Sequence, residues 1–254
     1  MAADAPSRWR LIADAPDQRV AVTAEALSLP LLAGMPSSIR AIRFALAAAD
    51  DGVPASWALD VPEFLARAVP RRRATFLAGR FCATAALEAA GYAATHPVLS
   101  RDSDGAPHWP EGFVGSIAHT DGESVAVATR REVTALIGVD VERVMAHETA
   151  VRIGARVAPE LTGIDRSTAD RLSPDLATTL AFSAKETLYK CLYPRVQRFF
   201  GFEAAEVEAI EPDGTVWLRL REMLHPTLPV GRRFAVSSTV LDAVVVTGLA
   251  VGRE

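Results

Sequence analysis

The stretch Phe182–Lys190, with the sequence FSAKETLYK, carries most of what this chain reveals about its fold. It places one carboxylate between two lysines inside an otherwise apolar run of helix-forming residues. Ser173 and Pro174 form a typical helix start, an N-cap residue followed by proline at the first helical position. Pro194 is expected to mark the far end of this helix.

On this helix, Glu186 and Lys190 are four residues apart and share a face, whereas Lys185 projects about 100° away around the axis. A Glu and a Lys on one stripe could hold a divalent cation and a phosphate oxygen side by side. An ordinary surface ion pair is the alternative, and it is the commoner case for such a pair taken alone.

A second stretch, Leu136–Glu142 with the sequence LIGVDVE, alternates apolar and other residues and predicts a strand with one apolar face. Asp140 and Glu142 then point the same way, with backbone positions about 6.5 Å apart, so that both carboxylates can reach one ion. Their oxygens suit Mg²⁺ or Mn²⁺, which bind carboxylates together with waters and substrate phosphates. A charged strand edge that discourages aggregation is the alternative.

A third stretch, Gly112–Gly122, leads from a short apolar patch to a lone histidine, His119, and a turn-like Asp-Gly pair. A strand is predicted to follow at Ser124–Thr129. His119 could donate a hydrogen bond to a phosphate or act as a base, and a hydrogen-bonded structural histidine is the alternative. No G-x-S-x-G elbow is present, so Ser116 and His119 do not form a hydrolase signature.

Positive charge is concentrated in the segment 67–80, which has five arginines, within a chain of net charge −4. Residues Arg71–Ala90 are predicted to form a helix closed by Gly91. Arg72 and Arg80 lie eight residues apart, slightly more than two turns, and therefore fall near one face. Two guanidinium groups on one face could grip a phosphate monoester, whereas a solvated basic helix end is the alternative.

Taken together, these stretches resemble the phosphopantetheinyl transferases of the surfactin and enterobactin type. The matching segments occur in the order of that family: Gly115–His119, Gly138–Glu142, and Phe182–Glu186 with Lys190. Three further segments resemble the subgroup typified by enterobactin synthase component D, which serves siderophore and polyketide synthases. They are Arg71–Arg80, Trp109–Gly112 and Gly201–Glu203. The resemblance covers approximately residues 65 to 205.

The resemblance implies an α+β fold of two similar halves related by a pseudo-twofold axis, with coenzyme A in the cleft between them. Residues 1–134 would form the half with the arginines and the histidine motif, and residues 135–254 the half with the carboxylates. Residues 1–40 receive no assignment. The remaining strands are expected at Ala41–Ala48, Thr215–Leu220, Arg233–Thr239 and Ala243–Val251, and an interruption of the helical region at Pro159–Pro174.

The implied activity is a Mg²⁺-dependent transfer, with Mn²⁺ as the alternative ion. The phosphopantetheine group of coenzyme A passes to a serine of an apo acyl or peptidyl carrier protein, and adenosine bisphosphate leaves. Asp140, Glu142 and Glu186 would bind the metal. Glu186, or a metal-bound water beside it, would take the serine proton. Lys185 and Lys190 would be catalytic and would meet the phosphates of the substrate.

The resemblance also implies which residues bind coenzyme A. Arg72 and Arg80 would hold its ribose phosphate with support from Arg101, and His119 would bind a further phosphate. Many relatives carry Ser or Thr immediately before this histidine, where the present chain has Ala118. One hydroxyl contact is therefore expected to be lost.

Composition narrows the classes of protein. The chain has 254 residues, half of them apolar, which is enough for a substantial core. The mild negative charge argues against a general nucleic-acid binder. The longest apolar runs are too short to span a bilayer, and no signal peptide is evident. Cys82 and Cys191 are expected to be reduced core thiols. These features predict a cytoplasmic monomer without membrane or nucleic-acid partners.

Two other functions compete with the transferase. One is a Mg²⁺-dependent phosphohydrolase that uses the same carboxylates on a nucleotide or on coenzyme A, and the other is a non-catalytic coenzyme A-binding module. For a transferase, the expected carrier dock lies just beyond the catalytic helix, where two adjacent phenylalanines cannot both easily point inward. It comprises Tyr193, Arg195, Val196, Arg198, Phe199 and Phe200.

Overall fold

The computed structural model describes residues 22–25, 39–44, 67–93, 99, 106–162, 172–241 and 243–252. These residues divide into two compact units, of which the first ends at Val133 and the second begins at Thr134. Arg101 lies outside the described residues, as do residues 163–171 of the expected interruption.

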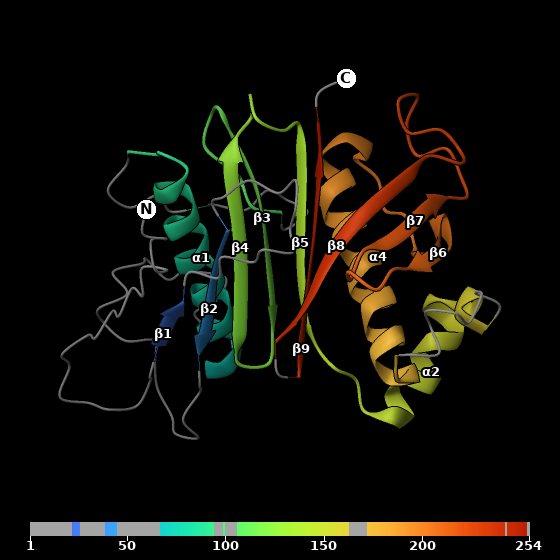
Figure 1. Cartoon of the computed structure of the whole chain (residues 1–254). Coiled ribbons are helices and arrows are strands. Elements are labelled where there is room, and N and C mark those ends of the chain that lie inside the picture. Colours follow the sequence, from blue (N-terminus) through green and yellow to red (C-terminus); the bar gives the residue numbers. More distant parts are fainter. Residues whose placement is uncertain are drawn as a thin grey trace, which may run out of the picture. The chain divides into compact units, whose positions relative to one another are not determined.

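The described residues of unit 1 form a four-stranded antiparallel sheet in the order β1-β2-β4-β3 and the long helix α1. Helix α1 packs on β2, β3 and β4 and covers one face of this sheet (Figure 1). Small side chains on both elements, Ala83 and Ala86 of α1 with Ala126 and Ala128 of β4, allow the close packing. The elements are β1 (Val22–Glu25), β2 (Ile39–Phe44), α1 (Pro70–Ala89), β3 (Phe113–Thr120) and β4 (Glu123–Arg130).

Two glycines shape the β3–β4 hairpin. Gly122 has a φ of +77° in the tight turn, a conformation that glycine adopts without steric penalty. Gly115 lies under the indole of Trp109, and a Cβ there would be 2.4 Å from the ring. The tryptophan lead-in and the glycine of the histidine motif are thus packing partners.

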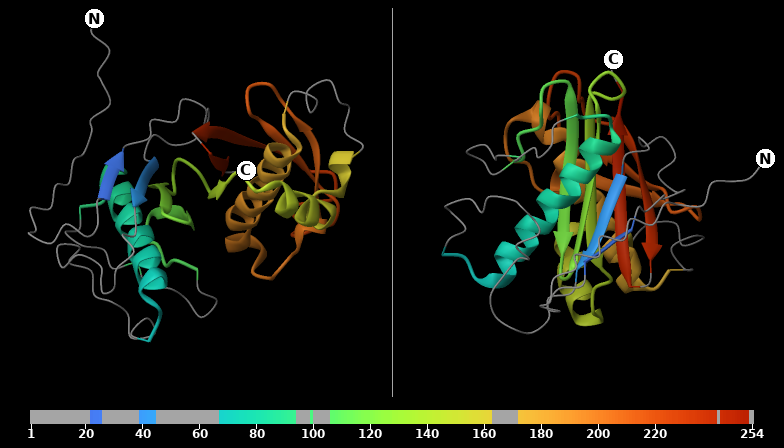
Figure 2. Two further views of the ribbon diagram at one scale, coloured as in Figure 1. Left: turned by 90° about the horizontal axis from the view of Figure 1, so that it is seen from below. Right: turned by 90° about the vertical axis from the view of Figure 1, so that its left-hand side faces the viewer.

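Unit 2 contains a five-stranded antiparallel sheet in the order β5-β9-β8-β7-β6, with α4 along one face. Helix α2 packs against α4, and the left view of Figure 2 shows α4 next to its own sheet. The helices are α2 (His147–Val157) and α4 (Pro174–Val196), with 3₁₀ turns η3 (Pro159–Thr162) and η4 (Phe202–Ala204). The strands are β5 (Leu136–Arg143), β6 (Ala205–Ile210), β7 (Val216–Leu220), β8 (Arg233–Leu241) and β9 (Val244–Val251).

Gly138 brings α4 unusually close to β5. A Cβ on Gly138 would lie 2.3 Å from the carbonyl oxygen of Thr187 and 2.8 Å from the Cβ of Cys191. Any larger residue would therefore push the helix off the strand. Because side chains alternate along a strand, Asp140 faces α4 as Gly138 does.

The α+β class is confirmed, as are the strands predicted around residues 124–129, 137–142 and the last three segments of the chain. Strand β6 was missed, because AEVEAI has weak β propensity. Ser173 is the N-cap of α4 and accepts a hydrogen bond from Leu176 N, as predicted. Pro194 does not end this helix, which continues to Val196 before Gln197 caps it with a φ of +54°.

Two smaller predictions concern α1 and the cysteines. The cap of α1 is Ala90, and Gly91, with a φ of +85°, is the left-handed residue that follows it. Cys82 and Cys191 are free and buried, as predicted, and burial raises the pKa of the Cys191 thiol. In the described part of the chain, no helix has the combination of length and hydropathy that crossing a bilayer requires.

Candidate active site

Unit 2 brings three of the predicted site residues together where α4 packs on β5. Asp140 of β5 is only 3% exposed, and its Oδ1 lies 2.5 Å from Lys190 Nζ of α4. Glu186, one turn before Lys190, belongs to the same electrostatic cluster. Burial raises the pKa of Glu186, the charge of Asp140 raises it further, and Lys190 acts in the opposite direction.

A hydroxyl group donates a hydrogen bond to the second carboxylate oxygen of Asp140. Ser183 Oγ donates to Asp140 Oδ2 over 2.8 Å, and Ser183 itself contacts Thr247 of β9. Neither residue was singled out from the sequence. A serine inside an apolar helix face and a threonine inside an apolar strand are the signals that could have identified them.

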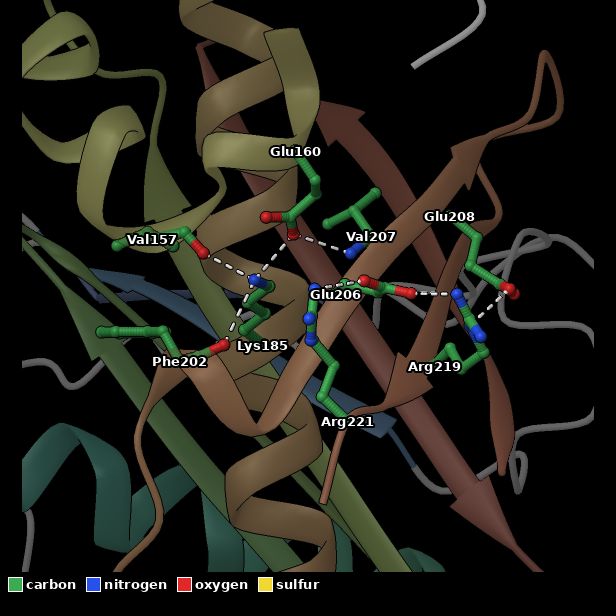
Figure 3. A network of polar contacts seen from close by, with 9 residues as sticks. All are labelled: Val157, Glu160, Lys185, Phe202, Glu206, Val207, Glu208, Arg219 and Arg221. Atoms are coloured by element: carbon green, nitrogen blue, oxygen red, sulfur yellow. Dashed lines mark hydrogen bonds and ion pairs between the residues drawn. The ribbon is translucent and has the colours of Figure 1, made fainter. Parts of the chain in front are cut away.

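Lys185 lies elsewhere on α4 and does not join this cluster. Its Nζ donates to the carbonyl oxygens of Val157 (2.6 Å) and Phe202 (3.2 Å) and pairs with Glu160 Oε1 at 2.8 Å (Figure 3). The side chain is 4% exposed. Burial lowers the pKa of its ammonium group, while the hydrogen bond and charge of Glu160 oppose this effect. The predicted contact of Lys185 with a substrate phosphate thus finds no support in its surroundings, because three acceptors already occupy its three donors.

Glu160 was not predicted from the sequence either. It lies in η3, and its Oε1 also accepts a hydrogen bond from Val207 N of β6 at 2.7 Å. Figure 3 shows that Lys185 and Glu160 adjoin a network of ion pairs, in which Glu206 of β6 pairs with Arg219 of β7 and with Arg221 just after β7.

The predicted metal ligands are only partly assembled. Glu142 follows Asp140 on the same side of β5 and is half-buried. Among the described residues, no three His, Cys, Asp or Glu side chains lie close enough together to hold a metal ion. The donors nevertheless suit a divalent cation, because Asp140 and Glu186 share the single positive charge of Lys190 and repel each other. Hard carboxylate oxygens of this kind are the ligands that Mg²⁺ prefers.

In unit 1, the predicted coenzyme A ligands have different environments. Arg72 is exposed near the start of α1, whereas Arg80 is buried with its guanidinium 4.5 Å from the ring centroid of Phe76. His119 is exposed on β3. Ala118 is buried and its side chain faces the core, so a residue there does not share the face of His119.

The expected carrier dock contains one exposed and one buried phenylalanine. Phe199 is 78% exposed, whereas Phe200 is 7% exposed and packs on Tyr189. The left-handed backbone of Gln197 turns the chain at this point. Arg195 donates to Thr227 Oγ1, and Arg198 lies 3.7 Å from Glu222 in an exposed ion pair.

Comparisons with known proteins identify the family of this chain. Residues 61–129 match the model of the 4'-phosphopantetheinyl transferase N-terminal domain, and residues 136–230 match that of the 4'-phosphopantetheinyl transferase superfamily. The chain is 36% identical over 193 residues to the 4'-phosphopantetheinyl transferase Svp of Streptomyces mobaraensis, covering 74% of this chain and 75% of that protein.

Two further relatives are similar over shorter stretches. The 4'-phosphopantetheinyl transferase PptT of Mycobacterium tuberculosis is 35% identical over 153 residues, which are 60% of this chain and 65% of that protein. Enterobactin synthase component D of Salmonella typhi is 36% identical over 143 residues, 55% and 56% of the two chains. The match therefore spans less than two thirds of either of these relatives. Both family models and the long match to Svp show that the chain belongs to the 4'-phosphopantetheinyl transferase superfamily.

Proposed function

We propose that this protein transfers the phosphopantetheine group of coenzyme A to a serine hydroxyl of an apo acyl or peptidyl carrier domain. The observation that carries this proposal is the cluster of Asp140, Glu186 and Lys190, which lies inside the segment that matches the superfamily model. Two acids and one lysine, of which Asp140 is buried and Lys190 is partly exposed, form an environment suited to the charge changes of phosphoryl transfer.

In the proposed reaction, the serine oxygen forms a bond to the β-phosphorus of coenzyme A. The bond from that phosphorus to the oxygen bridging the two phosphates breaks, and the electron pair leaves with adenosine 3',5'-bisphosphate. Glu186, or a water beside it, would accept the serine proton, because a carboxylate held next to the reacting hydroxyl can act as a general base. Lys190 faces the negative charge that develops on the leaving phosphate.

Asp140, Glu142 and Glu186 would hold Mg²⁺, or Mn²⁺, which neutralises the pyrophosphate of the substrate when bound. Asp140 keeps Lys190 at the site, and Lys190 in turn compensates the charges of Asp140 and Glu186. Lys185 holds α4 to η3 and η4 in this proposal and contacts no substrate.

Unit 1 supplies the proposed coenzyme A ligands Arg72, Arg80 and His119, with Arg101 in support. Arg72 and His119 are exposed and can meet a ligand directly. The guanidinium of Arg80 lies over the ring of Phe76, 4.5 Å from its centroid, and this cation–π contact would favour one direction of the side chain.

Incubation of the protein with coenzyme A, Mg²⁺ and a panel of apo carrier proteins, followed by intact-mass measurement, tests this function. We expect at least one carrier to gain a phosphopantetheine group on its serine, and none to gain it when that serine is alanine. A parallel reaction without carrier distinguishes the alternatives, because a phosphohydrolase would hydrolyse coenzyme A or a nucleotide there. Binding of coenzyme A without either reaction would leave only the non-catalytic module. Replacing coenzyme A with dephospho-coenzyme A measures the contribution of the proposed arginines.

A further inference from the structure

A chain of buried hydroxyl groups leads to the Asp140 carboxylate. Ser183 and Thr187 lie on α4 and Thr247 lies on β9, and all three residues are fully buried. Thr247 Oγ1 is 2.8 Å from Ser183 Oγ and 2.6 Å from Thr187 Oγ1. Ser183 Oγ is 2.8 Å from Asp140 Oδ2, so the chain of contacts ends on the carboxylate.

The sheet register and the helix packing put these groups together. Thr247 is the direct cross-strand partner of Asp140 in the β5–β9 pair, and such partners have side chains on one face of the sheet. The close approach of α4 at Gly138 then brings Ser183 and Thr187 onto the same face. The arrangement therefore depends on three elements distant in sequence.

Counting hydrogens gives the direction of each bond. An ionised carboxylate can only accept, so the single hydroxyl hydrogen of Ser183 is directed to Asp140. Thr247 must then donate towards Ser183, whose Oγ and carbonyl oxygen lie 2.8 and 3.0 Å away. Ser183 therefore donates to Asp140 and Thr247 donates to Ser183, whereas Thr187 can donate to Oγ1 of Thr247 at 2.6 Å or to its carbonyl oxygen at 3.4 Å.

These bonds and Lys190 hold the two oxygens of Asp140 separately. Oδ2 accepts from Ser183, and Oδ1 accepts from Lys190, so rotation of the carboxylate would break both contacts. We propose that Ser183, oriented by Thr247, is a positioning residue that fixes the Asp140 carboxylate for the transfer reaction. The inference rests on the proposed function, and neither hydroxyl touches a substrate in it.

Two substitutions of Thr247 distinguish a structural role of the hydroxyl groups from a role in positioning Asp140. A buried, satisfied hydroxyl contributes to stability whatever Asp140 does. Thr247→Val keeps the shape of the side chain and removes the hydroxyl, whereas Thr247→Ser keeps the hydroxyl and removes a methyl group. Both changes alter packing or hydrogen bonding, but only the valine variant interrupts the chain to Asp140.

Two measurements on the full-length protein test the proposal. The first is the binding of Mn²⁺ in the absence of coenzyme A and carrier. The electron paramagnetic resonance signal of the free ion monitors this binding. The second is steady-state transfer to a carrier that the wild-type protein modifies. We expect Ser183→Ala to weaken Mn²⁺ binding and to lower kcat by roughly tenfold, the scale known for groups that orient metal ligands. The KM for the carrier should not change.

The matched threonine variants decide between the two roles. We expect Thr247→Val to lower Mn²⁺ affinity and kcat by a smaller factor than Ser183→Ala does. Thr247→Ser should resemble wild type in both quantities. In a Ser183→Ala protein, Thr247→Val should have no further effect. Equal effects of valine and serine, additive effects in the double variant, or wild-type Mn²⁺ affinity and kcat in Ser183→Ala would overturn the proposal. If the Mn²⁺ results hold but wild type modifies no carrier, the proposed function fails while the positioning of Asp140 stands.

Discussion

Lys185 and Lys190 belong to one helix and one sequence motif, yet they have opposite surroundings. Lys185 is 4% exposed, and each of its three N–H donors has an acceptor. Two of these acceptors are main-chain carbonyl oxygens. Lys190 is 27% exposed and contacts a single carboxylate at the acid cluster. A lysine with every donor satisfied by protein stabilises the fold, whereas a lysine with spare donors and access to solvent can meet a substrate. This difference separates the buried, fully paired charge of Lys185 from the partly exposed charge of Lys190 on α4.

The largest expected effect is on the Lys190 side of the helix. Asp140→Ala and Lys190→Ala should each lower the rate of transfer by on the order of 10²-fold to 10³-fold, because each removes charge from the proposed reacting centre. Steady-state kinetics with carrier in excess measure the loss, and circular dichroism verifies the fold. Losses in the double variant should be far from additive, since the two residues act as a pair. Full activity in a folded Asp140→Ala protein would remove the basis of the assignment.

The second effect should appear in stability on the Lys185 side. Lys185→Met removes the ammonium group that pairs with Glu160 and with the carbonyl oxygens of Val157 and Phe202, and it should lower the free energy of unfolding by about 3 kcal/mol. Urea denaturation measures this loss, and Glu160→Gln in the same protein should recover part of it. Lys190→Met is the matched control. It should be less destabilising, because Lys190 is partly in water and Asp140 keeps its bond from Ser183. A larger loss in Lys190→Met would reverse the comparison.

A smaller effect concerns Glu186 and pH. Its pKa is raised from the ordinary value of 4.5, so the folded protein holds this proton more tightly than the unfolded chain. The contribution of Glu186 to stability is therefore fully present below 4.5 and is lost as the pH rises through the folded pKa. Glu186→Gln should be more stable than wild type at pH 8, and the advantage should vanish at pH 4. Urea titrations in a chelator at both pH values measure it. An advantage that does not depend on pH would contradict the cause given for the pKa shift.

The smallest effect is expected at the end of α4, where neither lysine contributes. Reversing charge with Arg195→Glu and Arg198→Glu should raise the KM for an acidic carrier several-fold at low ionic strength and leave the KM for coenzyme A unchanged. Added salt should reduce the difference, because these side chains are partly or fully exposed. Phe199→Ala is the apolar counterpart, and Phe200→Ala serves as its control for core packing. Unchanged carrier kinetics in both surface variants would place the dock on another face.

The sequence predicted the Lys190 side of the helix better than the Lys185 side. Spacing alone puts Glu186 and Lys190 on one stripe, and alternation puts Asp140 on one face of a strand. The partner of Lys185 could not be found in this way, because Glu160 lies in a 3₁₀ turn and the other acceptors are carbonyl oxygens, which every residue has. Thr247 was hidden for a related reason, because its role depends on the register of β5 with β9.

The short separation between α4 and β5 depends on the absence of a side chain at Gly138. At Gly138 the helix backbone occupies the volume that any Cβ would need, 2.3 Å from the carbonyl oxygen of Thr187. A methyl group at this position would act as a wedge, and it would lengthen the span from Asp140 to both Ser183 and Lys190 without altering any polar atom. Gly138 thus sets the distance between Asp140 and the α4 side chains that contact it.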